Sequence, residues 1–373
     1  MLHTVVSSLL KFYSMKRILS AALVLLSTSF GFGQDKNNNP LTISGYAEAY
    51  YLQDFNRPLN NTRPAFIYSH NRTNEVNINL AFLKANYSTD NLRANLAIGA
   101  GTYMNANYTA EPGVLKNIYE ANIGVKLSKQ HDLWIDAGIL PSHIGFESAI
   151  GKDNWTLTRS LLADNSPYFE AGAKLGYTSK SGKWYMAVLY LNGWQRIQRV
   201  DGNTTPSFGH QVTFKPADGI TLNSSSFIGS DKADSARQMR YFHNFYAQVQ
   251  LNKRLGLIAG FDFGAEQQVK GGDKYNTWYT PVLITRYALT EKVSLTARGE
   301  YYQDKAGVII ATGAPSGFKT WGYSVNVDYQ VLPNLVWRTE LRNLNSKNDI
   351  FLKRNNSPTG NSTTAVTAFA LSF

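Results

Sequence analysis

Residues 92–102 read Leu92-Arg-Ala-Asn-Leu-Ala-Ile-Gly-Ala-Gly-Thr102. Apolar side chains occupy every second position from Leu92 to Ala100, and polar or small side chains such as Arg93 and Asn95 lie between them. Successive side chains of a β-strand point to opposite faces of the strand. The alternation therefore predicts a strand with one face in an apolar medium and the other in water.

The same alternation recurs along most of the chain after residue 40. It is clear at 76–82, 119–127, 255–264, 293–301 and 323–329. A soluble β-sandwich alternates in the same way, because each of its sheets has one buried face and one solvated face. The choice between a sandwich and a membrane barrel therefore depends on the connections and on the charges.

The connections between the expected strands alternate between long and short. The long, polar ones are 54–74, 104–116, 141–165, 192–207, 229–238, 269–276, 305–317 and 346–362. The short ones are 88–91, 128–131, 179–182, 215–219, 252–254, 289–291 and 332–334. Long external loops and short periplasmic turns are typical of outer-membrane barrels. The pattern predicts an all-β fold, a transmembrane antiparallel β-barrel of about 16 strands, or about 14 if one hairpin is miscounted.

Charged side chains lie in the middle of the polar strand faces, where closing the strands into a ring would place them all in one lumen. Closure also pairs every strand edge, which lipid requires because it offers no hydrogen bonds. A barrel of this size is wide enough for an aqueous channel. The expected lumen-lining residues are Arg93, Glu120, Lys126, Asp136, Glu170, Lys174, Asp262, Arg298, Glu300, Arg338 and Glu340.

Aromatic residues gather near the expected strand ends, as they do in the two interfacial girdles of membrane barrels. They are Tyr50, Tyr51, Tyr103, Tyr119, Trp134, Tyr168, Phe169, Tyr177, Trp184, Trp194, Tyr241, Trp278, Tyr279, Trp321, Tyr323 and Trp337. The last strand ends on alternating apolar residues, Phe369, Leu371 and Phe373. A terminal aromatic in such a strand resembles the signal that the barrel assembly machinery recognises, so these three residues are the expected assembly signal.

The N-terminal segment has the parts of a secretory signal peptide. Lys16 and Arg17 precede an apolar run at 18–30, and small residues follow at 31–33. We expect cleavage after Gly33, with Met15 as the true start, although an uncleaved anchor is the alternative. Residues 34–40 would then form a short periplasmic tail, and 41–373 the barrel. The prediction is an exported protein of the outer membrane of a Gram-negative bacterium.

The formal net charge of +11 includes Lys11, Lys16 and Arg17, so the mature chain carries +8. A basic balance is common in proteins that bind nucleic acid. An exported chain without a basic helix or an arginine run does not fit that class, and we expect no nucleic-acid partner. Contact with membrane lipid and lipopolysaccharide, or a channel that leans toward anions, agrees better with the charge.

Short motifs between Asp136 and Arg196 allow comparison with known families. They are Asp136-Ala-Gly-Ile-Leu-Pro141, Gly145-Phe-Glu147, Asn154, Arg159-Ser160, Pro167-Tyr168, Gly172 and Asn192-Gly-Trp194. These motifs resemble those of the OmpL-like β-barrel porins (the porin-2 family). The layout is also similar to that of other bacterial porins around their third external loop. The resemblance implies an outer-membrane channel and no particular solute.

The longest connection, Pro141–Asn165, is the candidate functional site, because the resemblance to porins implies a loop that narrows the pore at this place. It carries His143, Glu147, Lys152, Asp153, Arg159 and Asp164. Opposite charges that face each other across a constriction would select solutes by charge and size. The loop could equally pack over the mouth without touching a solute. Acidic and basic residues are balanced along the expected wall, so we predict weak charge selectivity.

The sequence gives little indication of an enzyme active site or a metal site. The mature chain has five histidines, His70, His131, His143, His210 and His243, and none stands in a local motif with a serine. No two have metal-ligand spacing and there is no cysteine, so we expect no metal, no cofactor and no enzyme activity. The prediction is a porin-like channel for passive diffusion of small hydrophilic solutes. A receptor, an adhesin or a structural barrel is the alternative, and an outer-membrane hydrolase is a weaker one. A barrel of this size is compatible with a homotrimer.

Overall fold

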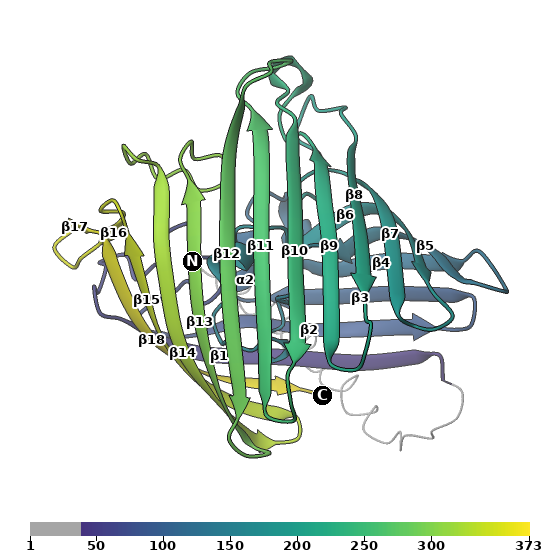
Figure 1. Ribbon diagram of the computed structural model, residues 1–373, viewed down its shortest axis with the longest axis horizontal. Coiled ribbons are helices and arrows are strands. Elements are labelled where there is room, and N and C mark those ends of the chain that lie inside the picture. The colour runs from purple at the N-terminus through teal and green to yellow at the C-terminus, as the bar shows by residue number, and fades with distance from the viewer. Residues whose placement is uncertain (1–38) are drawn as a thin grey trace, which may run out of the picture. The chain divides into compact units, whose positions relative to one another are not determined.

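The computed structural model describes residues 39–373, and within them sixteen antiparallel strands close into one barrel (Figure 1). The predicted signal peptide and most of the predicted tail lie outside the described residues, so both stay predictions. The barrel strands are β1 (Leu41–Asp54), β2 (Val76–Ser88), β3 (Leu92–Ala100), β4 (Ile118–Lys126), β5 (Asp132–Pro141), β6 (Phe169–Thr178), β7 (Trp184–Leu191), β8 (Ser207–Phe214), β9 (Ile220–Gly229), β10 (Arg240–Gln250), β11 (Leu255–Gln267), β12 (Tyr275–Ala288), β13 (Val293–Asp304), β14 (Phe318–Leu332), β15 (Leu335–Ser346) and β18 (Asn361–Ser372).

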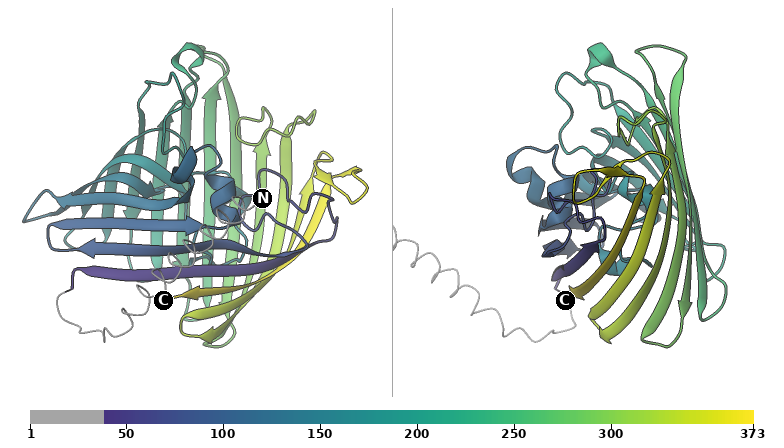
Figure 2. Two further views of the ribbon diagram at one scale, coloured as in Figure 1. Left: turned by 180° about the vertical axis from the view of Figure 1, so that it is seen from behind. Right: turned by 90° about the vertical axis from the view of Figure 1, so that its left-hand side faces the viewer.

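Each strand pairs with its neighbours in sequence, and β1 closes the ring by pairing with β18. The last residue takes part in this closure, because Phe373 and Gly45 exchange two backbone hydrogen bonds of 2.8 and 3.0 Å. The wall made by β1–β3 runs in a very different direction from the wall made by β10–β12 (Figure 2). Strong strand tilt of this kind accompanies closure of a barrel. The sixteen-strand prediction is confirmed, and the fourteen-strand alternative is wrong.

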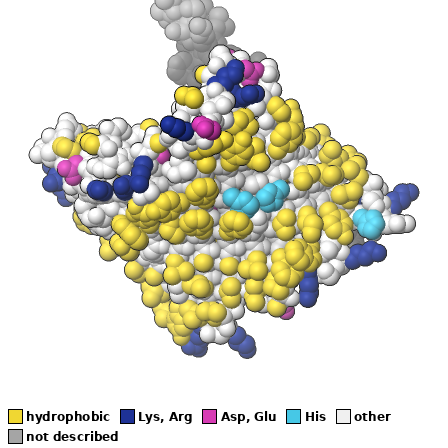
Figure 3. Space-filling model, turned by 45° about the horizontal axis from the view of Figure 1, so that its top comes forward, with side chains coloured by type: hydrophobic (Ala, Val, Ile, Leu, Met, Phe, Trp, Pro, Cys, Tyr) yellow, Lys and Arg dark blue, Asp and Glu magenta, His cyan; other side chains and the backbone are white. Residues whose placement is uncertain are grey.

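The outward faces of the strands are apolar, as the alternation predicted. On β3, Leu96 is 49% exposed and Ile98 is 57% exposed, although both side chains are large and aliphatic. Figure 3 shows this outer surface as a broad apolar band, with Lys and Arg side chains toward its edges. A continuous apolar belt around a closed barrel is the surface that faces lipid. No helix within residues 39–373 is long and apolar enough to cross a membrane.

The long connections leave from one end of the barrel, called here the loop end, and the short ones from the other, called the turn end. The loops contain small elements that the sequence did not predict. They are α2 (Thr102–Asn107), η1 (Gly113–Asn117), η2 (Gly151–Asp153), α3 (Leu161–Asp164), η3 (Asp234–Ala236) and the hairpin of β16 (Phe351–Leu352) and β17 (Pro358–Thr359). The strand expected to reach Thr102 ends at Ala100, because Gly101 adopts a φ of 128° and α2 follows it.

The loop-end half of the interior is filled rather than open. The first loop (residues 55–75) and the third loop (residues 142–168) supply Phe66, Ile67, Ile144 and Leu161 to one apolar cluster with inner-wall side chains such as Trp278. A lumen open to water along its whole length is therefore not what the structure shows. Five aromatics predicted for the interfacial girdles lie inside instead, each at most 9% exposed: Tyr50, Tyr103, Tyr168, Phe169 and Trp278.

Candidate functional site

The third loop enters the barrel and is bound to the inner wall by its own backbone. The N–H groups of Leu157 and Thr158 donate to Asn326 at 3.1 Å and Glu340 at 2.6 Å. The N–H of Leu161 donates to Glu300 at 2.5 Å. A buried loop needs partners for its backbone polar groups, and side chains of β13, β14 and β15 supply three of them.

Two arginines and two glutamates form a fully buried network beneath the loop. Arg298 binds Glu340 at 2.9 Å and lies 3.4 Å from Glu300, which also binds Arg342 at 2.6 Å. Arg298 further donates to the carbonyl oxygen of Thr158 at 2.7 Å. Buried charges are tolerated when they are paired and hydrogen-bonded. Three of these residues were expected to line an aqueous lumen, but the third loop covers them.

Arg338 makes a second attachment between wall and loop. Its guanidinium binds Asp328 at 2.7 and 3.0 Å. It also donates to the carbonyl oxygens of Gly151 at 2.6 Å and Asn154 at 2.9 Å. Both carbonyls belong to the segment around η2. The Arg338 side chain therefore holds the part of the third loop that lies nearest the turn end.

His143 makes the attachment on the opposite side of the barrel. Its Nδ1 lies 2.8 Å from a carboxylate oxygen of Glu170, and its Nε2 lies 2.8 Å from the carbonyl oxygen of Ser226. Both partners are acceptors, so both ring nitrogens must carry protons, which is the imidazolium form. Burial lowers the pKa of His143, but the Glu170 carboxylate outweighs burial, and the pKa is raised overall.

Glu147 and Arg159 hold the loop in its own shape. Arg159 is fully buried and donates to the carbonyl oxygens of Ser148, Leu157 and Ala149 at 2.7–2.9 Å. Glu147 accepts from both the backbone N–H and the hydroxyl of Ser160. Ser160 is also the N-cap of α3, where its side chain accepts from the N–H of Ala163 at 3.1 Å. Serine is a favoured residue at this position of a helix.

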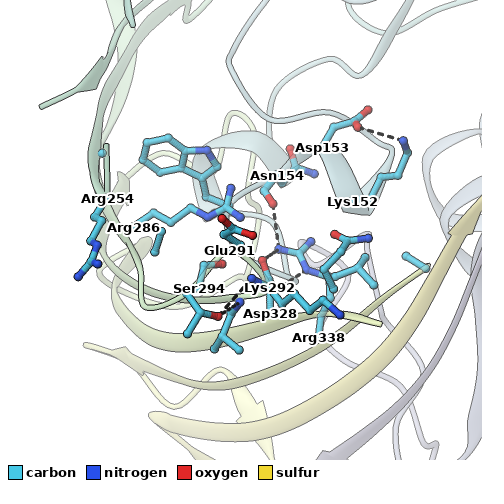
Figure 4. Close-up of a pocket in the computed structure, with 18 of the residues that line it drawn as sticks. Lys152, Asp153, Asn154, Arg254, Arg286, Glu291, Lys292, Ser294, Asp328 and Arg338 are labelled. Carbon is cyan, nitrogen blue, oxygen red and sulfur yellow. Dashed lines mark hydrogen bonds and ion pairs between the residues drawn. The ribbon is translucent and has the colours of Figure 1, made fainter. Parts of the chain in front are cut away.

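Lys152 and Asp153 of η2 face a cavity of about 540 Å³ at the turn end (Figure 4). The two side chains are partly exposed and lie 3.9 Å apart. We call this cavity the basic chamber. Its charged lining residues are Lys152, Asp153, Lys253, Arg254, Arg286, Glu291, Lys292, Asp328 and Arg338. Six of these nine side chains are basic, and the nine come from the third loop, two turns and the inner wall.

A second cavity, of about 580 Å³, opens among the loops and is lined by Arg63 and Asp164. Both side chains are buried, and neither oxygen of the Asp164 carboxylate has a hydrogen-bond partner among the described residues 39–373. Burial raises the pKa of Asp164 to about 7 and lowers the pKa of Arg63 to about 10. Arg63 belongs to the first loop, which the sequence analysis did not place in the barrel. The same loop also brings His70 to Glu48 at 2.9 Å.

The remaining expected wall residues form local pairs on the inner face. Arg93 binds Asp136 at 2.6 Å, and Lys174 lies 3.9 Å from the same carboxylate. Lys84 binds Glu120 at 2.6 Å, and Lys126 lies 3.9 Å from Asp132. Asp262 accepts from Asn244 at 2.5 Å. The four basic side chains keep between 23% and 35% of their side-chain surface exposed.

His210 and His243 lie on the outward face, within the apolar band. Each is bonded to a serine: Ser226 Oγ lies 2.5 Å from His210 Nδ1, and Ser224 Oγ lies 2.9 Å from His243 Nε2. Their neighbours Phe208 and Phe245 on the same faces are 49% and 51% exposed. Within residues 39–373, neither histidine hydrogen-bonds a carboxylate, and no three histidine, aspartate, glutamate or cysteine side chains group as a metal site would require.

A family model described as "Putative beta-barrel porin-2, OmpL-like" matches residues 40–373, which is the whole barrel. The chain belongs to this porin-2 family. No curated protein matches it in sequence. The resemblance drawn from the motifs around the third loop is thereby confirmed.

Solved structures resemble this porin-2 member in fold at very low sequence identity. The outer membrane channel DcaP of Acinetobacter baumannii has a TM-score of 0.58 at 9% identity, covering 92% of this chain and 99% of that chain. An anion-selective porin from Comamonas acidovorans has a TM-score of 0.57 at 10% identity, covering 89% and 99%. OmpT of Vibrio cholerae, in its trimer form, has a TM-score of 0.55 at 10% identity, covering 90% and 100%. Family and fold together support an outer-membrane channel of the porin type.

Proposed function

We propose that this porin-2 member lets small hydrophilic solutes diffuse passively across the outer membrane of a Gram-negative bacterium, with weak selection by charge. The observation that carries the proposal is the third loop held inside a closed barrel, with one cavity at the turn end and another among the loops. In the proposed channel, a loop in this position would narrow the pore. Export by cleavage of residues 1–33 and assembly as a homotrimer belong to the same proposal.

The passage would run on the β2–β6 side of the third loop and would need the loop to shift, because Ala149 and Ala163 of the loop pack there in one buried apolar cluster with Phe82 and Ala171. On the opposite side the loop is bonded directly to β13–β15, and Arg298, Glu300 and Glu340 are at most 3% exposed. On the β2–β6 side the basic residues Lys84 and Arg93 keep 27% and 35% of their side-chain surface exposed. Lys152 and Asp153, at the lower edge of the loop, are the proposed constriction residues that face open space.

Solute uptake into liposomes tests this proposal. The refolded barrel would be placed in multilamellar liposomes, and swelling rates would be compared for neutral sugars of increasing size. Swelling that falls steadily with solute size is the expected result for a passive, size-limited pore. Liposomes that contain the folded barrel and swell no faster than empty ones would contradict the proposal.

A closed barrel that acts as a receptor, adhesin or structural protein is the second candidate. The complete burial of the network around Arg298 favours it, because the loop-end interior is packed with apolar and paired side chains. Absence of swelling for every sugar, together with correct folding, would support this candidate over the channel.

A further inference from the structure

Arg286 differs from the other basic side chains on the inner wall. It lies on β12 near the turn end, is half-buried, and points into the basic chamber (Figure 4). In residues 39–373 it has no carboxylate within 4 Å, whereas the other inward-pointing strand arginines and lysines each have one. These paired residues are Lys84, Arg93, Lys126, Lys174, Arg240, Arg298, Arg338 and Arg342.

The surroundings of Arg286 add to its charge rather than neutralise it. Lys253, Arg254 and Lys292 line the same chamber, and none of them has a carboxylate within 4 Å in the part of the chain that the structure describes. Of the three acidic lining residues, Asp328 is bound by Arg338 and Asp153 lies beside Lys152. With six basic and three acidic side chains, the chamber has a formal excess of three positive charges.

The shape of the chamber increases the effect of this excess. A concave site with walls of low dielectric constant focuses the field of its charges and raises the local concentration of counter-ions. Trp155 forms part of this wall. Its indole ring packs closely against Gly256, where an added Cβ would lie 2.6 Å from the ring. The half-buried guanidinium of Arg286 has lost part of its hydration shell. A bound oxyanion can take the place of the remaining water molecules, because it accepts two hydrogen bonds from the guanidinium.

We propose that the basic chamber selects small anions, with Arg286 as the residue that sets the selectivity. Carboxylates and inorganic phosphate are the solutes whose chemistry fits an unpaired guanidinium. This inference rests on the proposed channel function and names the class of solute that the channel prefers. Transport stays passive. The chamber is open to solvent and its exposed charges bind a single ion weakly, so the ion is released without a source of energy.

The test is the reversal potential of the refolded full barrel in a planar bilayer under a potassium chloride gradient. We expect chloride to be about threefold more permeant than potassium at ~0.1 M salt, and the preference to fall toward unity at ~1 M, where screening is strong. Arg286→Gln should lose at least half of the preference, and Arg286→Lys should keep most of it. Lys180→Gln is the matched control, since Lys180 lies in another turn and does not line the chamber.

The outcomes separate the two proposals. Cation preference in the wild-type channel, or equal losses in Arg286→Gln and Lys180→Gln, would overturn the anion inference and leave the channel function standing. Absence of current from a barrel whose circular dichroism shows β-structure would overturn the channel function, and the inference with it. In the described part of the chain Arg286 has no ion pair to lose, so the variants should fold as the wild type does, and their circular dichroism would verify this.

Discussion

The backbone N–H of Leu161 and the carboxylate of Glu300 are joined by a hydrogen bond of 2.5 Å, although 139 residues separate them in the sequence. Leu161 begins α3 in the third loop, and Glu300 lies on β13. The contact places the tip of the loop against one wall of the barrel. In the proposed channel, the width of the passage depends on how firmly the loop is held there.

Weakening this attachment should free the loop. Glu340→Gln removes the charge that pairs with Arg298 and weakens acceptance from the N–H of Thr158. Breaking a buried pair by neutralising one partner costs about 3–5 kcal/mol. We expect a larger and noisier single-channel conductance and faster trypsin cleavage after Lys152 and Arg159. Asp90→Asn, in an exposed turn that does not line the basic chamber, is the control, and identical cleavage of the two variants would mean that the network does not hold the loop.

The packing of the third loop should weaken as pH rises. The pKa of His143 is raised in the folded barrel. Its contribution to the stability of the packed loop is therefore fully present below about pH 6.5, and it is lost as pH rises through the pKa of the folded state. Burial raises the pKa of Asp164 from its ordinary 3.8 to about 7, so its contribution to the stability of the packed loop is also lost as pH rises, between 3.8 and 7.

We therefore expect more current noise at pH 8 than at pH 5, because the loop is more mobile at the higher pH. His143→Gln combined with Asp164→Asn should remove most of this dependence. Noise that rises on acidification in the wild-type channel would show that other groups control the loop.

Ser224 should contribute to stability and not to catalysis. Its hydroxyl lies between His210 Nε2 at 3.3 Å and His243 Nε2 at 2.9 Å on the lipid-facing surface. Ser224→Ala removes one hydrogen-bond partner from each imidazole in an apolar setting. We expect it to lower the free energy of unfolding by about 1–3 kcal/mol. The measurement is the urea midpoint of unfolding in detergent. Release of fatty acid from phospholipid by the wild-type barrel, lost in Ser224→Ala, would instead identify a lipid hydrolase.

Deleting Phe373 separates assembly from folding. The residue closes the seam with Gly45 by two backbone hydrogen bonds, and its ring is 66% exposed on the outer surface. If the terminal aromatic is read by the assembly machinery, the amount of barrel in the outer membrane should fall at least several-fold in cells. Refolding in detergent should change little, because the rest of the β1–β18 seam remains. Equal losses in cells and in detergent would assign Phe373 a purely structural role.

The barrel itself could be predicted from sequence because the decisive signals are local. Period-two alternation around Leu96 and the alternating loop lengths depend only on neighbouring residues. The alternation of side chains between the two faces of a strand also indicates two features that the sequence analysis did not include. Arg342 shares its face with Arg338 and Glu340 on β15, and His210 shares the lipid-facing side of β8 with Phe208.

The pairing inside the barrel could not be predicted, because it depends on strand stagger and on loop paths. Arg93 reaches Asp136 across 43 residues, and Arg298 reaches Thr158 across 140. The burial of His70 and Arg63 has no sequence signal, since both lie in a loop without periodicity. Of the six loop residues expected to form a constriction, only Lys152 and Asp153 face the basic chamber.

The current through the refolded wild-type barrel in a planar lipid bilayer tests the central claim most directly. We expect stepwise increases of current as single barrels insert, with a conductance that grows with salt concentration. A barrel that shows β-structure and shifts in mobility on boiling, yet adds no current at any voltage, would contradict the channel. The packed third loop would then be a plug rather than a constriction.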